Sequence, residues 1–212
     1  MAPCIKEQGG EGRVSIEIKK SDRVILEQFQ QLIPYNSTIS ERTRTTNFAA
    51  ASESAVWTVC SLDFRQTLTT LGLPTGRKSD IVVPPSVSLS EPDYFRGWVD
   101  ANGSVGYTAQ DFPFLSLTIA SDAIAQAYLH FLASVTGKEK RVTRNARDNI
   151  FNIVVTKEDA CAVVSTLYPL GCLALPRKEA KARAVTAWTR PAAMRRVAHK
   201  PRIVGMADEE GS

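Results

Sequence analysis

The sequence predicts an α+β fold made of two tandem copies of one unit that combines strands with helices. Three observations predict it: related patterns recur with a period near 100 residues, short segments alternate apolar and polar side chains, and longer segments carry apolar residues at helical spacing. We expect one pseudo-symmetric body with halves over residues 1–86 and 87–188, followed by a tail over residues 189–212.

A strand followed by a helix is predicted near the start of each copy. Residues 14–18 and 114–119 alternate apolar and polar side chains, which is typical of strands with one buried face. Ser21-Asp22 and Ser121-Asp122 follow, 100 residues apart, and each precedes apolar residues at helical spacing. These pairs predict helix N-termini, because Ser and Asp side chains accept hydrogen bonds from the free N–H groups there.

Each copy then continues with strands and a second helix. Basic, β-prone stretches at residues 38–44 and 141–147 are followed by more apolar strands at residues 55–60 and 150–155. Helices beginning after Ser61 and Thr156 end near Gly72 and Gly171, since glycine readily adopts the left-handed conformation after a helix. The predicted unit is β-β-α-β-β-α, written twice.

A linker and a further helix lie between the copies. Residues 82–86 (VVPPS) contain consecutive prolines, which cannot continue a helix or a central strand. A helix over residues 94–101 is opened by Ser90-Glu91-Pro92-Asp93 and ends at Asn102-Gly103. Inside this helix Gly97 costs up to ~1 kcal/mol relative to alanine, so we expect a second helix to approach closely there.

Charge is distributed unevenly along the chain, although its formal net charge is only +4. Residues 1–176 have a net charge of −1, residues 177–202 have +8, and the last ten residues hold three acids. A basic tail of this kind favours an acidic partner, nucleic acid first, and a tail that only keeps the protein soluble is the alternative.

Composition excludes several classes of protein. With 43% apolar residues the chain is not of the disordered type, and no apolar run approaches the ~18 residues of a membrane span. Four cysteines without a CxxC spacing and two histidines argue against a zinc site. The N-terminal segment is too short and too polar for a secretory signal peptide, so we expect a cytoplasmic protein, nucleoid-associated when bound to DNA.

Residues 95–105 (FRGWVDANGSV) resemble the LAGLIDADG motif, the signature helix of a family of homing endonucleases. The surrounding sequence resembles the family too, with Leu71-Gly72 and residues 76–80 (GRKSD) upstream and residues 167–178 downstream. The resemblance covers most of residues 11–188, and the first motif helix is missing or degenerate.

The resemblance implies tandem pseudo-two-fold αββαββα units with two motif helices at the centre. Two four-stranded antiparallel sheets would form a saddle over double-stranded DNA. Basic residues of the groove-facing strands would contact DNA, and solvated outer faces of a sheet are the alternative for each of them. These candidates are Arg42, Arg44, Lys140, Arg141, Arg144 and Arg147.

The resemblance also implies metal-dependent hydrolysis of DNA, with Mg2+ held by an acid at the foot of each motif helix. The eighth motif residue binds the metal, and here it is Asn102, which offers a carbonyl oxygen but no charge. Asp100, a carboxylate at the sixth position, is a further metal candidate, although this position normally caps or buttresses the helix foot. Gly97 and Asp100 are the candidates for the helix interface. We expect self-association through the unpaired motif helix.

Glu11, Lys78 and Lys178 complete the candidate catalytic set. Residues 9–14 match residues 100–105, which places Glu11 at the metal position of the first copy, and a turn acid in a Gly-rich segment is the alternative. Lys78 and Lys178 are repeat-related lysines of the kind that assist in this family. A phosphate contact or a solvated loop charge is the alternative for both.

The functional prediction is a DNA-binding protein similar to a LAGLIDADG homing endonuclease, whose ancestral activity is site-specific, metal-dependent DNA cleavage. A cleavage-deficient DNA-binding or regulatory relic is the first alternative, and Asn102 favours it. A fragment of an intein-embedded endonuclease is the second. No GxxxxGK[ST] phosphate loop is present.

Overall fold

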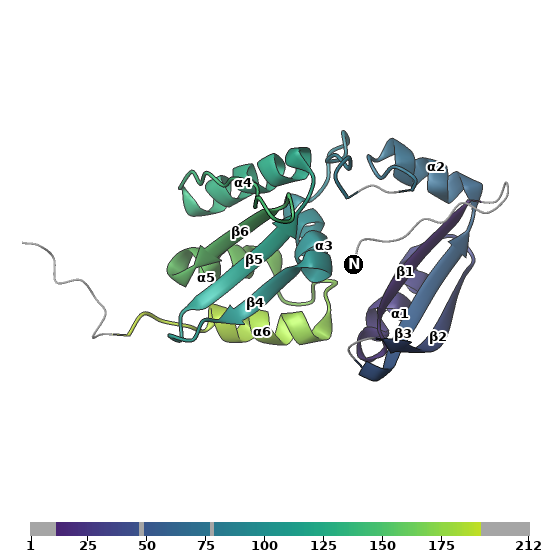
Figure 1. Cartoon of the computed structure of the whole chain (residues 1–212), viewed down its shortest axis with the longest axis horizontal. Coiled ribbons are helices and arrows are strands. Elements are labelled where there is room, and N and C mark those ends of the chain that lie inside the picture. Colours follow the sequence, from purple (N-terminus) through teal and green to yellow (C-terminus); the bar gives the residue numbers. More distant parts are fainter. Residues whose placement is uncertain (1–11, 47–48, 77–78, 192–212) are drawn as a thin grey trace, which may run out of the picture.

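The computed structural model describes residues 12–46, 49–76 and 79–191, and it has the form of two α+β halves side by side (Figure 1). Each half contains one antiparallel sheet with helices packed on it. The predicted α+β class and its tandem arrangement are confirmed.

The first half contains a sheet in the order β1-β3-β2. Its elements are β1 (Arg13–Lys19), the short 3-10 helix η1 (Lys20–Asp22), α1 (Val24–Leu32), β2 (Ser37–Thr46), β3 (Ala49–Cys60) and α2 (Leu62–Thr70). No motif helix precedes β1 within the described residues.

The second half contains a sheet in the order β4-β5-β6. Its elements are α3 (Glu91–Asn102), β4 (Gly103–Tyr107), β5 (Pro113–Ile119), α4 (Asp122–Thr136), β6 (Phe151–Thr156), α5 (Lys157–Leu167) and α6 (Pro176–Thr186). The helix α3 lies on the side of this half that faces the first half (Figure 1).

Alternation along the strands separates a helix-covered face from a helix-free face in each sheet. In β5 every second residue from Pro113 to Ile119 is buried, and in β3 Ala55, Trp57 and Val59 are buried beneath the helices. The helix-covered faces build two cores, of which the larger belongs to the second half. The opposite faces carry no helix that the structure describes, and on that of the first sheet Val56 is buried.

Most of the local predictions are confirmed. The hydroxyls of Ser61, Ser90 and Ser121 accept hydrogen bonds from backbone N–H groups at the starts of α2, α3 and α4. Gly72 and Gly171 have φ angles of +90° and +77°, in the left-handed region that glycine favours.

Two local predictions are wrong. Ser21-Asp22 lies in η1 and provides no side-chain cap for α1, because the Asp22 carboxylate is buried and paired with Arg177 instead. Residues 141–147 are not a strand, and only Arg144 forms an isolated bridge, with Phe151. Among the described residues each sheet therefore has three strands, where four were expected.

One ion pair links the two halves. Arg177 Nε at the start of α6 donates to Asp22 Oδ2 over 2.8 Å, and the Asp22 side chain is only 4% exposed. Leu175 completes the core of the first half from the second. No helix in the described part of the chain is long and apolar enough to cross a membrane.

Candidate nucleic-acid interface and metal site

The foot of α3 is where the motif places its chemistry. Asn102 ends the helix and β4 begins at the next residue, so the chain turns within one peptide. Gly103 is required there, because an added Cβ would lie 2.7 Å from the carbonyl oxygen of Ser116 and 2.9 Å from that of Val99.

Asp100 buttresses this foot. Its Oδ1 accepts a hydrogen bond from the Tyr168 hydroxyl over 2.7 Å, and its Oδ2 accepts one from the backbone N–H of Leu175 over 2.9 Å. Burial raises the pKa of Asp100 above its usual value, and these two hydrogen bonds oppose the rise. Both carboxylate oxygens are thus engaged with the protein, as the motif's sixth position predicts.

Lys178 caps the C-terminus of α3. Its ammonium donates to the carbonyl oxygens of Val99, Asp100 and Gly103, the last two over 2.7 and 2.9 Å. The residue is 4% exposed, and burial lowers its pKa to about 8. Of these acceptors, the Asp100 carbonyl belongs to the last turn of α3, where a helix end leaves carbonyls without intrahelical partners. Lys178 therefore holds the foot in place, instead of being a solvated loop charge.

The described residues do not fit a magnesium ion at this foot. Magnesium prefers carboxylate oxygens, yet Asn102 is an amide and each Asp100 oxygen already accepts a hydrogen bond from the protein. No group of three or more His, Cys, Asp or Glu side chains that could hold a metal occurs within residues 12–46, 49–76 and 79–191. Glu11 and Lys78, the remaining candidates, lie outside these ranges.

Sheet topology bears on the position of Glu11. The strand β1 pairs with β3 and leads into η1 and α1, just as β5 pairs with β6 and leads into α4. By topology β1 therefore corresponds to β5, whereas the match of residues 9–14 with residues 100–105 equates it with β4. Within the described chain the first half has no counterpart of β4. Glu11 as a metal ligand stays a prediction.

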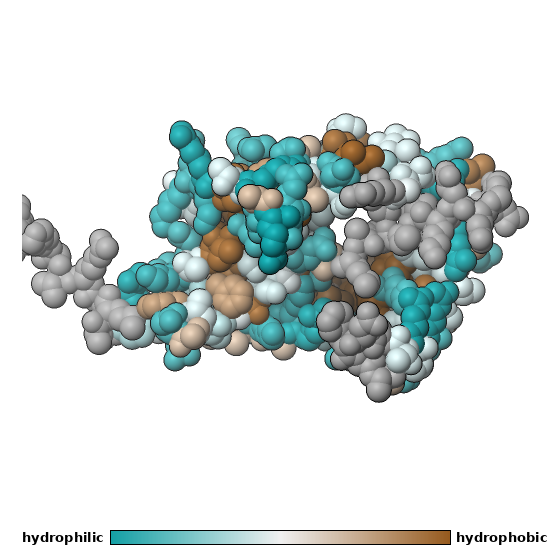
Figure 2. Space-filling model, in the orientation of Figure 1, coloured by the Kyte–Doolittle hydropathy of each residue, from teal (hydrophilic) through white to brown (hydrophobic). Residues whose placement is uncertain are grey.

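The outward side of α3 faces a cavity of about 1020 Å³ between the halves. Gly97 and Ala101 of α3 line it together with Ile18, Ile25 and Phe29 of the first half. An added Cβ at Gly97 would meet no described atom within 4 Å, so no described helix makes the close approach predicted there. In Figure 2 hydrophobic residues are visible in this region between the halves.

Arg42 and Arg44 lie on the helix-free face of the first sheet. In the β2–β3 register they stand opposite Ser54 and Ser52, out of phase with the buried Ala55 and Trp57. Both arginines are exposed. This is the face on which the family resemblance predicts the DNA contacts.

The four basic candidates of the second half are not on a strand of the sheet. Arg144 bonds to Asp122 and to the carbonyl oxygens of Ala120 and Asn149, and it lies 4.7 Å from the centre of the Phe151 ring. The predicted strand over residues 141–147 does not form, because side-chain contacts of Arg144 hold this segment at the end of the sheet in place of a series of backbone hydrogen bonds to a neighbouring strand. Lys140 donates to the Val154 carbonyl, Arg147 pairs with Asp148, and Arg141 is exposed.

Sequence reasoning missed the side chains that anchor α3. Arg96 is 5% exposed, and it donates over 2.9 Å to each of the carbonyl oxygens of Leu167 and Leu173 and pairs with Asp93. Its position on the inward side of the helix, one residue after Phe95, is the only available signal. Tyr168 lies in the downstream segment 167–178, where nothing in the residue pattern indicates its hydrogen bond to Asp100.

This arrangement of two pseudo-repeated α+β halves, with α3 between their antiparallel sheets, is shared with a solved homing endonuclease, so the chain has a homing-endonuclease fold. The chain is similar to the homing endonuclease I-WcaI bound to its DNA recognition sequence, with 12% identity and a TM-score of 0.54, over 85% of this chain and 80% of that one.

Two further solved structures are similar to a lesser degree. They are I-SmaMI bound to uncleaved DNA target in the presence of calcium ions (12% identity, TM-score 0.46, 78% and 76% of the two chains) and I-LtrWI bound to target DNA (8%, 0.39, 73% and 73%). No protein-family model and no curated protein matches the chain.

Proposed function

We propose that the chain binds double-stranded DNA across the helix-free faces of its two sheets. The observation that carries the proposal is the register of β2 and β3, which places Arg42 and Arg44 on the helix-free face of a fold similar to that of DNA-bound I-WcaI. Arginine side chains on such a face can neutralise phosphates or read guanine edges in the major groove.

We further propose that the chain binds DNA without efficient double-strand cleavage. Metal-dependent hydrolysis needs carboxylates at the foot of the motif helix, and Asn102 supplies none. The Asp100 oxygens already accept hydrogen bonds from Tyr168 and Leu175. Residual Mg2+-dependent activity would depend on Glu11. Cleavage remains the second candidate function, because I-WcaI is a homing endonuclease.

Binding is tested first with the purified full chain. Selection from a randomised duplex pool, followed by fluorescence anisotropy on the recovered sequence, is expected to give a defined site. Competition by an unrelated duplex should be at least tenfold weaker. Equal affinity for every duplex, or none for any, would overturn the proposal.

Cleavage is then tested on a plasmid that carries the recovered site, with Mg2+ present. We expect the plasmid to stay largely supercoiled. The matched variant Asn102→Asp restores the motif acid, and an increase in nicking would assign the loss to this position. Linearisation by the unaltered chain that Glu11→Ala abolishes would contradict the cleavage-deficient proposal.

A further inference from the structure

The two sheets differ in charge. The strands of the second sheet read GSVGY, PFLSLTI and FNIVVT and contain no charged residue. The strands of the first sheet contain seven, and the register places five of them on the helix-free face. These five are Arg13, Glu17, Lys19, Arg42 and Arg44.

The basic residues of that face are mostly without carboxylate partners. Arg13, Lys19 and Arg42 form no ion pair with any residue that the structure describes. Arg44 meets Glu17 at 3.5 Å, a weak and exposed contact, and Glu17 also accepts a hydrogen bond from Ser54. Four cations against one anion leave this face positive, which suits a polyanion.

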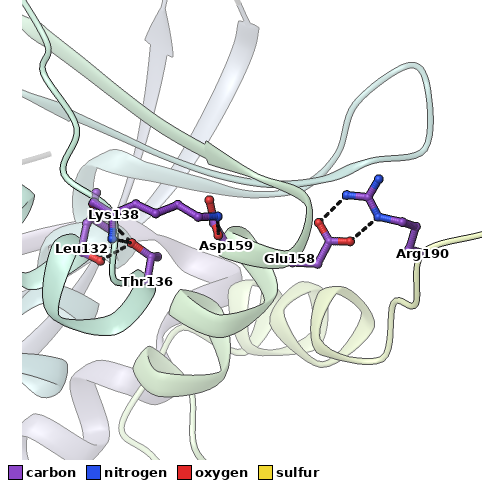
Figure 3. Close-up of polar contacts among 6 residues, drawn as sticks. All are labelled: Leu132, Thr136, Lys138, Glu158, Asp159 and Arg190. Atoms are coloured by element: carbon purple, nitrogen blue, oxygen red, sulfur yellow. Dashed lines mark hydrogen bonds and ion pairs between the residues drawn. The ribbon is translucent and has the colours of Figure 1, made fainter. Parts of the chain in front are cut away.

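Many cations of the second half are instead neutralised within it. Figure 3 shows Lys138 paired with Asp159 over 2.6 Å and Arg190 paired with Glu158 over 2.6 Å, both at the start of α5. The hydrogen bond from Arg190 lowers the pKa of Glu158 to about 2. Arg144 and Arg147 have carboxylate partners too, in Asp122 and Asp148.

The helix-free face of the second sheet offers neutral groups. Its hydroxyls and amide come from Ser104, Ser116, Thr118, Asn152 and Thr156, with Phe114 and Val154 between them. Thr118 donates to Asn152 over 2.9 Å, so part of this surface is already ordered. Such groups can bond to base edges, but they release no counterions from DNA.

We propose that the two sheets divide the DNA interface: the β1–β3 sheet supplies the phosphate contacts through Arg13, Lys19, Arg42 and Arg44, and the β4–β6 sheet meets DNA through neutral side chains. The proposal rests on the proposed DNA-binding function. It predicts that, of the two sheets, the first contributes to the salt dependence of binding and the second does not, although both halves carry the same fold.

The test is the slope of log K against log [salt], where K is the binding constant measured by fluorescence anisotropy on a labelled duplex that carries the recovered site. The variant Arg42→Ala/Arg44→Ala is expected to make the negative slope shallower by about 2, since each phosphate contact contributes about 0.9 to its magnitude. The matched control Arg141→Ala/Arg147→Ala removes two exposed arginines of the second half and should change the slope by less than about 0.5. Residues 189–212 are kept in all variants, so their contribution cancels.

Glu17→Gln gives a signature of opposite sign. It removes the anion of the positive face and is expected to tighten binding about threefold and steepen the slope, an effect that partial unfolding would not produce. Circular dichroism at the assay temperature verifies that each variant is folded. If the two double variants lose the same slope, the division between the sheets is overturned while DNA binding stands; if the unaltered chain does not bind, the proposed function fails instead.

Discussion

Replacement of Tyr168 by phenylalanine tests the contacts that hold the foot of α3. The Tyr168 hydroxyl donates over 2.7 Å to Asp100 Oδ1, at a carboxylate whose pKa burial raises. The substitution removes the hydroxyl and leaves the packing of the ring unchanged. One oxygen of a half-buried carboxylate then loses its protein donor, while Leu175 still serves the other.

The expected loss follows from the charge of the acceptor. A hydrogen bond to an ionised group contributes about 1.5–3 kcal/mol and one between neutral groups about 1 kcal/mol. Tyr168→Phe should therefore lower the free energy of unfolding by about 2 kcal/mol at pH 7, or roughly 4–8 °C in Tm for a chain of this size.

The loss should depend on pH with a defined sign. Because the folded pKa of Asp100 is raised, the folded state holds its proton to higher pH than the unfolded state does, and stability falls as pH rises through the folded pKa. Removing the Tyr168 donor raises that pKa further. The loss in the variant should therefore be smaller at pH 4, about 1 kcal/mol, than at pH 7, about 2 kcal/mol, because Asp100 is protonated to a greater extent at the lower pH.

Urea unfolding followed by tryptophan fluorescence measures both values. Tyr107→Phe is the matched control, because the Tyr107 hydroxyl also donates over 2.7 Å, but to the neutral carbonyl of Ala184 and at an exposed position. We expect Tyr107→Phe to lower the free energy of unfolding by less than about 1 kcal/mol at either pH. Equal losses for the two variants at pH 7, or a Tyr168→Phe loss that does not change with pH, would refute the assignment of Asp100 as a charged acceptor.

Three further outcomes are expected. Gly97→Ala should stabilise the chain by up to about 1 kcal/mol in thermal unfolding, because no described atom lies within 4 Å of an added Cβ; destabilisation would show that another helix packs there. Arg144→Ala should lower the free energy of unfolding by about 1–3 kcal/mol and Arg147→Ala by under about 0.5, since only Arg144 donates to the part-buried carbonyl of Ala120 and lies over an aromatic ring. As the pH rises from 8 to 10.5, the free energy of unfolding of the unaltered chain should increase by up to about 3 kcal/mol relative to that of Lys178→Met, because only the unfolded state keeps Lys178 protonated in this range. Parallel plots of unfolding free energy against pH for the two proteins would contradict a lowered pKa for Lys178.

The elements that the sequence predicts well are those fixed by local chemistry. The hydroxyls of Ser61, Ser90 and Ser121 lie where a helix needs acceptors for its first N–H groups, and the structure uses all three. The alternating pattern of residues 114–119 likewise gives a strand with one buried face. In these cases the residue and the group that it satisfies are neighbours in the chain.

The elements that it predicts poorly depend on partners far along the chain. Residues 141–147 have the composition of a strand, yet Arg144 finds Asp122 and a carbonyl on the loop before α4, 22 to 24 residues away. Aspartate is a preferred residue at helix N-termini, yet the carboxylate of Asp22 pairs with Arg177, 155 residues away. Pattern and propensity carry no information on such pairs, so neither could be predicted from the sequence.

The candidate site divides in the same way. The place of Asp100 as a buttress follows from the motif, and its two hydrogen bonds agree with that place. The role of Lys178 as a cap does not follow, because a lysine in a basic, Pro-initiated stretch is typical of a solvated helix start. Its burial becomes visible only when α6 is placed against the end of α3.

Position and charge at the foot of α3 depend on different residues. The Tyr168 hydroxyl donates to the Asp100 carboxylate, and the Lys178 ammonium donates to the carbonyls of Asp100 and Gly103. These bonds fix where the helix ends, and none of them involves the Asn102 carboxamide. An amide in place of a carboxylate at Asn102 therefore removes a charge that a metal would need and leaves these bonds of Asp100, Lys178 and Tyr168 in place. The proposed DNA binding uses the helix-free faces, where Arg42 lies, and does not use this charge. For this reason a chain with Asn102 can keep a DNA-binding surface after efficient cleavage is lost.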